Sequence, residues 1–128
     1  MSRGLADTSV FIAAEWGRSL DVNVLPDQLA VSIITIGELR AGVLAAADTA
    51  TRDRRLNTLT SALALDPILI DGDVAAAWAL LRVALRDAGL RMPVNDSWIA
   101  ATAMSLGVPV VTQDDDFPGI AGLDVVRV

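Results

Sequence analysis

Short apolar runs alternate along the chain with longer segments in which apolar residues recur every three or four positions. The short runs predict five buried strands, at residues 3–6, 29–32, 67–71, 109–112 and 124–128. The longer segments predict five helices, at residues 9–16, 33–47, 49–64, 73–88 and 95–106. Strands that alternate with helices in this way predict a parallel α/β sheet that is covered by helices on both faces. In such sheets, ligands bind beyond the carboxyl ends of the strands.

The whole chain, residues 1–128, is expected to form a single domain. Hydrophobic residues make up 53% of it, which argues against disorder. No uncharged apolar run approaches the roughly 18–20 residues of a membrane span, and the N-terminus lacks the apolar stretch of a signal peptide. The chain has no cysteine, which excludes disulfides and thiolate metal sites. We therefore expect a cytoplasmic protein that does not enter a membrane.

Acidic residues stand at positions where the neighbouring sequence is apolar. Asp7 ends the first predicted strand and Asp114 follows the fourth, so both would lie at the carboxyl edge of the sheet. Asp96 lies in the first turn of the last helix, and Glu38 lies on an apolar helix face, where an acid is costly unless paired or metal-bound. Taken singly, these acids have simpler explanations. Asp7 could cap a helix, Asp96 could serve a helix dipole, and the run 114–116 could be a solvated loop.

Taken together, the acids predict a bound cation. Two carboxylates about 5 Å apart repel each other by roughly 3 kcal/mol at an effective dielectric constant near 20. A cluster of four would cost several times that amount without a neutralising ion. The chain has no His, Cys or Lys, so the ligands would all be oxygen atoms, which favour Mg²⁺ or Mn²⁺ over Zn²⁺. Such an ion can activate water for attack on phosphorus.

The net charge of −6 disfavours binding of nucleic acid by bulk charge. All ten basic residues are Arg, however, and the planar guanidinium group suits phosphate. A local group of Arg residues, together with bound cations, could therefore still serve a polyanion.

Four segments carry a resemblance to a known family. In order and spacing, "LADTSVFIA", "SIITIGELRAG", "NDSWIAATA" and "VVTQDDDF" resemble the acidic motifs of the PIN-domain nucleases, and among these the VapC toxins of bacterial toxin–antitoxin pairs. The resemblance covers essentially the whole chain. It implies a three-layer α/β/α fold with a five-stranded parallel sheet. It also implies an endoribonuclease activity that depends on Mg²⁺, for which Mn²⁺ can substitute.

The resemblance also assigns roles to particular residues. Asp7, Glu38 and Asp96 match the first three acids of the family, and Asp114 and Asp116 together match its last motif. Asp115 falls on a variable position of that motif. The expected supporting hydroxyls are those of Thr8, Ser9 and Thr112. The implied mechanism is in-line attack on an RNA phosphodiester by a metal-activated water that the carboxylate cluster holds in place.

The resemblance further implies three partners: an RNA substrate, either tRNA or another structured RNA; a small cognate antitoxin that covers the acidic site; and a second copy of the chain in a homodimer. Arg40, Arg91 and the Arg52/Arg54/Arg55 group are the candidates for RNA contact. The simpler interpretation is that they are solvated charges on helix faces, and for Arg54 and Arg55 it is the preferred one. Helix 74–85 could belong to the core or to the dimer interface, and the core is the preferred interpretation. The three tryptophans are expected in the core, although Trp16 could instead stack on a partner.

The sequence also has to be compared with functions of other classes. The main alternative is a catalytically inactive PIN-like module that binds protein or RNA, against which the complete set of acids argues. A phosphoacceptor receiver domain would need a Lys after its last strand, and the chain has none. A phosphatase with two Asp spaced by one residue is disfavoured, because Asp7 is followed by Thr8 and Ser9.

Overall fold

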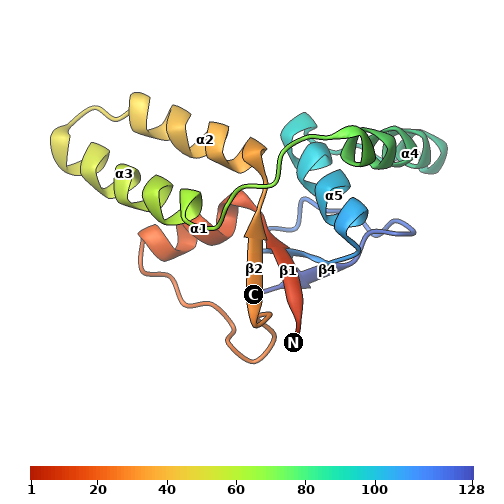
Figure 1. Cartoon of the computed structure of the whole chain (residues 1–128), viewed down its shortest axis with the longest axis horizontal. Coiled ribbons are helices and arrows are strands. Elements are labelled where there is room, and N and C mark those ends of the chain that lie inside the picture. The colour runs from red at the N-terminus through yellow and green to blue at the C-terminus, as the bar shows by residue number, and fades with distance from the viewer.

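Four short parallel strands form the centre of the protein, in the order β2–β1–β3–β4 (Figure 1). The computed structural model describes residues 1–128. The strands are β1 (Arg3–Ala6), β2 (Gln28–Val31), β3 (Val110–Thr112) and β4 (Val125–Arg127). β1 pairs with both β2 and β3, and β3 pairs with β4, always in parallel register. The predicted α/β class and the parallel sheet are confirmed.

The prediction of a fifth strand at residues 67–71 is wrong. Only Ile68 pairs with the sheet, through an isolated parallel bridge to Ser32 beyond the end of β2. Its neighbour Pro67 has no N–H to donate, and Asp66 has a left-handed backbone with φ 53°. Leu69 is 65% exposed, so the chain has already left the sheet one residue later. Instead of forming a strand, the segment makes two backbone hydrogen bonds: the carbonyl oxygen of Ile68 accepts from the N–H of Ile33, and the N–H of Ile68 donates to the carbonyl oxygen of Val31.

Five helices follow the predicted pattern to within three residues at each end. They are α1 (Thr8–Glu15), α2 (Ile33–Leu44), α3 (Thr49–Leu63), α4 (Gly72–Ala88) and α5 (Val94–Leu106). Side-chain oxygens of Asp7, Ser32, Asp48 and Asp71 cap the first four helices by accepting a backbone N–H of the first turn. α5 starts at Pro93 without a side-chain cap. None of these helices is both long enough and apolar enough to span a membrane.

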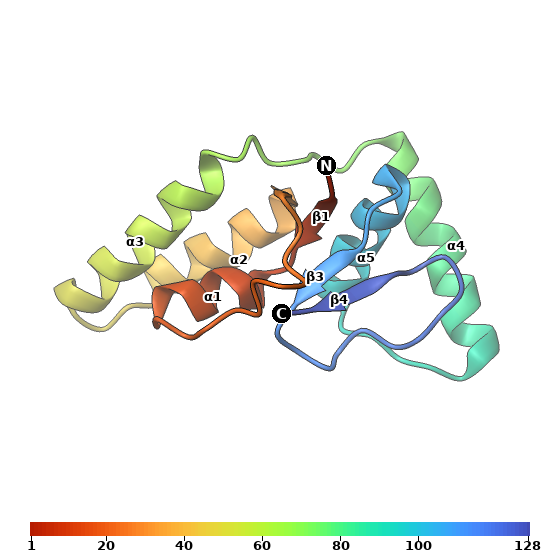
Figure 2. The same cartoon turned by 90° about the horizontal axis from the view of Figure 1, so that it is seen from below.

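The sheet is covered on both faces, because successive residues of each strand point to opposite sides. Leu5 and Val110 pack on one face in a core with residues of α4 and α5. Ala6 and Val111 pack on the other face against Val10 of α1. Figure 2 shows the two halves, with α4 and α5 on one side of the strands and α1, α2 and α3 on the other. The predicted three-layer arrangement of helices around a sheet is therefore present.

Helices α2 and α3 form a hairpin that extends away from the sheet (Figures 1 and 2). A separate apolar cluster holds it together, built from Val31, Ile36, Leu39, Leu59 and Ala62. The first turns of α1 and α2 lie at the carboxyl ends of β1 and β2, which they follow directly in the chain. The hairpin therefore borders the sheet edge at which ligands bind in parallel α/β folds.

The tryptophans are placed differently from the prediction that all three belong to the core. Trp78 and Trp98 are half-buried and stack on each other, with ring centroids 4.3 Å apart. Trp16 is 54% exposed, so its assignment to the core is wrong. It is the C-cap residue of α1 and directly follows the last helical residue, Glu15.

Candidate functional site

Asp7 is the buried centre of the site, at 3% exposure. It is the first residue after β1 and the cap of α1, so the strand and the helix both fix its backbone. Its Oδ1 accepts hydrogen bonds from the backbone N–H of Ser9 at 2.9 Å and from the Ser9 hydroxyl. Its Oδ2 accepts from the hydroxyl of Thr112 at 2.7 Å. The helix-cap interpretation of Asp7 is thus correct, and it coexists with a place in the acidic site.

Thr112 and Ser9 join the end of β3 to the start of α1. The Thr112 hydroxyl donates to Asp7 and accepts from the backbone N–H of Asp114 at 3.0 Å. The Ser9 hydroxyl accepts from the backbone N–H of Gln113 at 2.9 Å. These bonds fix the start of the loop that carries Asp114 and Asp116 beside Asp7. The two hydroxyls therefore act as a scaffold, as expected for supporting residues.

Glu38 reaches the same site from α2. It is half-buried, and its Oε1 accepts a hydrogen bond from the Thr8 hydroxyl at 2.7 Å. The Thr8 hydroxyl also lies 3.0 Å from that of Thr35, which is fully buried in the first turn of α2. This chain of hydroxyls links α1 to α2 and orients the Glu38 carboxylate. Glu38, an acid on an apolar helix face, thereby has a hydrogen-bond donor in Thr8, 30 residues away in sequence.

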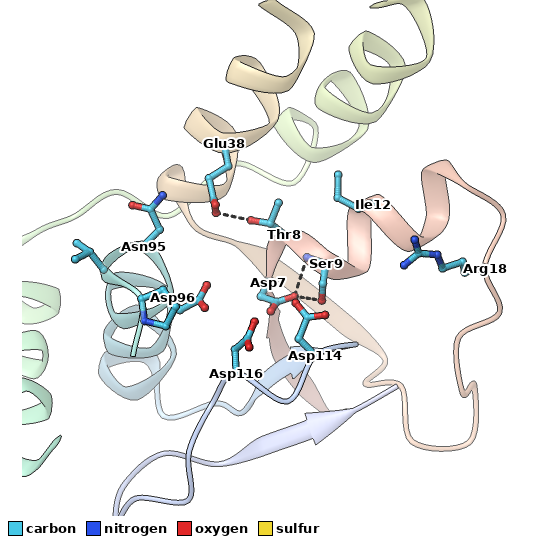
Figure 3. Close-up of a pocket in the computed structure, with 12 residues that line it drawn as sticks. Asp7, Thr8, Ser9, Ile12, Arg18, Glu38, Asn95, Asp96, Asp114 and Asp116 are labelled. Carbon is cyan, nitrogen blue, oxygen red and sulfur yellow. Dashed lines mark hydrogen bonds between the residues drawn. The ribbon is translucent and has the colours of Figure 1, made fainter. Parts of the chain in front are cut away.

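The acids converge on one cavity of about 620 Å³ (Figure 3). Asp7 comes from the end of β1, Glu38 from α2, and Asp96 from the first turn of α5, while Asp114 and Asp116 come from the loop after β3. Figure 3 shows these side chains approaching from different elements around Asp7. The other residues that line the cavity are Thr8, Ser9, Ile12, Arg18, Pro93, Val94 and Asn95.

The clustering of carboxylates changes how the acids ionise. The pKa of Asp96 is raised from its ordinary value of 3.8 to about 6, first by burial and then by the negative charges of Asp7, Asp116, Glu38 and Asp114. The pKa of Asp7 is also raised, because burial outweighs the hydrogen bonds from Ser9 and Thr112 that favour its charged form. Perturbed carboxyls that meet in a cavity are typical of a functional site.

Comparison with known proteins identifies the family. The model of the PIN domain matches residues 5–123. The chain belongs to the PIN-domain family. It is 49% identical over 128 residues to Ribonuclease VapC5 of Mycobacterium tuberculosis, covering 98% of this chain and 95% of that protein. It is 45% identical over 126 residues to Ribonuclease VapC4 of the same organism, with coverage of 98% and 97%. The resemblance to VapC proteins is confirmed.

The fold of this PIN domain also matches a solved relative. The crystal structure of VapBC-5 from Mycobacterium tuberculosis, a member of the VapBC family of toxin–antitoxin systems, aligns with a TM-score of 0.91. The two chains share 46% identity, and each is covered completely. Such agreement over full length places the four acidic segments of the PIN domain on the same framework of strands and helices.

The donor set of the PIN domain fits a hard divalent cation. Five carboxylates line the cavity, no nitrogen or sulfur ligand of His or Cys is available, and Arg18 is the only basic residue in the lining. No group of three acids is close enough together to hold an ion as the side chains stand. Binding of an ion would therefore require these carboxylates to turn further inward.

The arginines proposed for RNA contact lie away from the acidic cavity. Arg40 is exposed on α2 and does not line the acidic cavity. Arg91 lines a different cavity, with Arg82 and Arg86 of α4. Arg18, which the sequence did not single out, lies at the acidic cavity just beyond α1 (Figure 3). The signal available for it was its place one residue after Gly17, whose left-handed backbone with φ 69° ends the helix that starts at the first acid.

Asp115 lies outside the cavity, although it stands between two acids that line it. Its carboxylate pairs with Arg127 of β4, and both side chains are largely exposed. Asp114 and Asp116 line the cavity. This alternation agrees with the interpretation of Asp115 as a variable loop position. Asn95, next to Asp96, also lines the cavity and was not predicted.

Proposed function

We propose that this protein is the ribonuclease toxin of a toxin–antitoxin pair, and that it hydrolyses RNA phosphodiesters endonucleolytically with a divalent metal ion. The observation that carries the proposal is the single cavity lined by Asp7, Glu38, Asp96, Asp114 and Asp116. The VapC relatives named as ribonucleases support the reaction class. The solved VapBC relative supports the toxin–antitoxin context.

Asp7 and Asp96 are the proposed direct ligands of Mg²⁺, or of Mn²⁺ in its place. Glu38, Asp114 and Asp116 complete the site, directly or through water. When bound, the ion supplies a nucleophilic water at neutral pH and neutralises charge on the phosphoryl oxygens. The excess of carboxylates over basic groups at the cavity supports this assignment. The pKa of Asp96 is raised first by burial and then by the negative charges of the other four acids, so part of this rise reflects uncompensated charge.

The other side chains of the cavity hold these acids in position. Ser9 and Thr112 donate to both oxygens of Asp7, which fixes the direction in which its remaining lone pairs point. The Thr8 hydroxyl donates to one oxygen of Glu38, Oε1, and so orients that carboxylate. Arg18 offers a guanidinium group to an RNA phosphate at the rim of the cavity. Residues held by such bonds do not have to be ordered again when the substrate arrives, which lowers the barrier.

The acidic cavity also bears on the partners. A free cavity with five carboxylates and one Arg attracts cationic groups, so an antitoxin segment carrying a basic side chain would neutralise and block it.

For the homodimer, α4 offers an apolar surface: Leu80 is 72% exposed and Val83 is 46% exposed, one helical turn apart. Val74, Leu81 and Leu85 of the same helix are buried in the core.

The test is cleavage of total RNA by the purified chain with Mg²⁺, with and without EDTA. We expect the wild-type protein to cut RNA, Asp96→Asn to lose cleavage by at least about a hundredfold, and EDTA to abolish it. Asp73→Asn is the matched control, because Asp73 occupies the first turn of α4 but lies outside the cavity. Wild-type cleavage that EDTA leaves unchanged, or an Asp96→Asn protein with full activity, would refute the proposal.

The alternative is an inactive PIN-like binding module, and metal titration separates the two. A functional site should raise the melting temperature of the wild-type protein as Mn²⁺ is added, because the ion binds the folded state only. The same titration should shift Asp96→Asn less. No change in melting temperature at millimolar Mn²⁺ would favour the binding module.

A further inference from the structure

A second cavity opens directly from the acidic one, where α1, α2 and α3 meet. Its volume is about 250 Å³. It shares Thr8, Ile12 and Glu38 with the acidic cavity, so the two form one continuous surface. Its other lining residues are Glu15, Trp16, Leu39, Gly42 and Arg55. An extended polymer with one phosphate among the acids would therefore continue along this surface.

Trp16 lines this cavity although it is 54% exposed. The guanidinium carbon of Arg54 lies 4.2 Å from the centroid of its ring, in a cation–π contact. Arg54 does not line the cavity, so it supports the indole from outside. Arg54 forms a long ion pair with Glu15, in which Nε lies 3.9 Å from Oε2 and makes no hydrogen bond. Glu15 also accepts a hydrogen bond from Thr58 at 2.9 Å.

The stability of the fold does not require these contacts of Trp16, Arg54 and Glu15. The Glu15 side chain is only 2% exposed, and a buried carboxylate paired with an arginine contributes little net stability compared with an apolar pair. Trp16 itself lies outside the three apolar clusters of the core. The Arg54–Glu15 pair supports the exposed ring of Trp16 in one orientation. Stacking of a nucleobase requires a surface of this kind.

A positive charge also lines this cavity, on Arg55. Arg55 donates a hydrogen bond through Nη1 to the carbonyl oxygen of Gly42 in α2, at 2.7 Å. Ile12 and Leu39 contribute apolar side chains to the same lining. The cavity thus combines an aromatic platform, apolar side chains and a cation, and the carboxylates of Glu15 and Glu38 also line it. A nucleotide presents the complementary set, since it carries a flat base, a sugar and a phosphate.

We propose that this cavity binds the nucleotide next to the scissile phosphodiester, with its base stacked on Trp16 and its phosphate held by Arg55. The assignment rests on the ribonuclease function proposed above. Every base has a π-face, so Trp16 contributes affinity for any single-stranded segment and little selectivity between bases. A side chain of an antitoxin is the competing occupant, and the kinetics of RNA cleavage decide between the two.

The experiment compares cleavage of a short single-stranded RNA that contains a site cut in total RNA by the wild-type chain. Stacking one base on an aromatic residue is worth about 1–3 kcal/mol, or about 5- to 150-fold in affinity. We expect Trp16→Ala to raise KM within that range with little change in kcat, and Trp16→Phe to stay within about threefold of wild type. Melting curves of both variants verify that the fold is intact.

Arg55→Ala provides a second probe that leaves the indole in place. Arg52→Ala is its matched control, because Arg52 also lies on α3 and also donates to a backbone carbonyl near the end of α2, but does not line the cavity. We expect Arg55→Ala to raise KM and to weaken its dependence on salt, and Arg52→Ala to change neither.

Binding is measured separately in an Asp96→Asn background. The same RNA should quench Trp16 fluorescence, seen as the difference from protein that also carries Trp16→Phe. Unchanged KM in Trp16→Ala, with no difference in quenching, would overturn the inference, and this holds even if the variant loses affinity for an antitoxin. Failure of the wild-type protein to cut RNA would instead refute the proposed function.

Discussion

Asp96→Asn should make the metal-free protein more stable at neutral pH. The carboxyl of Asp96 has a pKa of about 6 in the folded protein and 3.8 as its ordinary value, because it is half-buried and faces four other acids. The folded state therefore holds this proton more tightly than the unfolded state does. Its contribution to the unfolding free energy is largest below pH 4 and is lost as the pH rises through about 6. Above about pH 6, the charged carboxylate of Asp96 destabilises the folded state, and substitution by Asn removes this effect.

The size of the effect follows from the two pKa values. Their difference corresponds to about 3 kcal/mol, which solvent screening of this half-exposed group reduces to about 1.5 kcal/mol. Loss of a first-turn acid also removes a favourable interaction with the dipole of α5, worth about 0.5 kcal/mol. The net gain of about 1 kcal/mol would raise Tm by about 4 °C in a chain of this length.

The assay is thermal unfolding in EDTA at pH 7.5 and at pH 4.5. Asp96→Asn should melt above the wild type at pH 7.5, and the difference should shrink at pH 4.5, where Asp96 is largely protonated. Asp73→Asn, a first-turn acid of α4 outside the cavity, measures the dipole contribution alone and should melt slightly below the wild type. If Asp96→Asn melts below the wild type at pH 7.5, or by the same margin at both pH values, the electrostatic reasoning is wrong.

Asp7→Asn is expected to behave differently, although it removes the same charge. Both Asp7 oxygens accept hydrogen bonds, two from Ser9 and one from Thr112. An amide would turn an NH₂ group toward one set of these donors, so relief of repulsion is offset by lost hydrogen bonds at a buried position. The structure thus predicts different effects on stability for two substitutions that remove the same charge.

Two further predictions concern the scaffold and the assembly. Thr112→Val leaves the Oδ2 atom of Asp7 and the N–H of Asp114 without their partner, so it should cost about 2 kcal/mol in urea unfolding and slow RNA cleavage, while Thr112→Ser should retain both. Full activity in Thr112→Val would show that the hydroxyl does not orient Asp7. Leu80→Lys should convert the proposed homodimer to a monomer in sedimentation, whereas Leu44→Lys, at an equally exposed site on α2, should not. A dimer that survives Leu80→Lys would place the interface elsewhere.

The elements of the fold were predictable because their signals are local. Apolar periodicity placed every helix, and side-chain caps such as Asp48 and Asp71 mark helix starts at short range. The strand predicted at residues 67–71 failed because its apolar residues do not reveal whether a pairing partner is within reach. Its backbone leaves the sheet after Ile68, although the sequence "PILI" looks like a buried strand.

Exposure was harder to predict than secondary structure. Trp16 looked like a core residue because tryptophan is usually buried. Its exposure depends on where α1 ends relative to α3, from which Arg54 reaches over the ring. Arg40 and Arg91 were plausible RNA contacts by residue type, but Arg18 is the arginine that reaches the acidic cavity. Which way a surface side chain faces is decided by the packing of its helix, and periodicity does not report this for isolated charges.

The sequence by itself determined the parallel α/β class, the acids that meet at the cavity and the kind of cation that such ligands suit. Strand ends and the chemistry of ligands both depend directly on the types of residue present. It also carried the family, through four short motifs. Only the tertiary structure decided how the acids are supported. Thr8 meets Glu38 across 30 positions and Thr112 meets Asp7 across 105. Such bonds depend on the crossover connections of a parallel sheet, which bring the ends of distant strands to one edge and leave no local trace in the sequence.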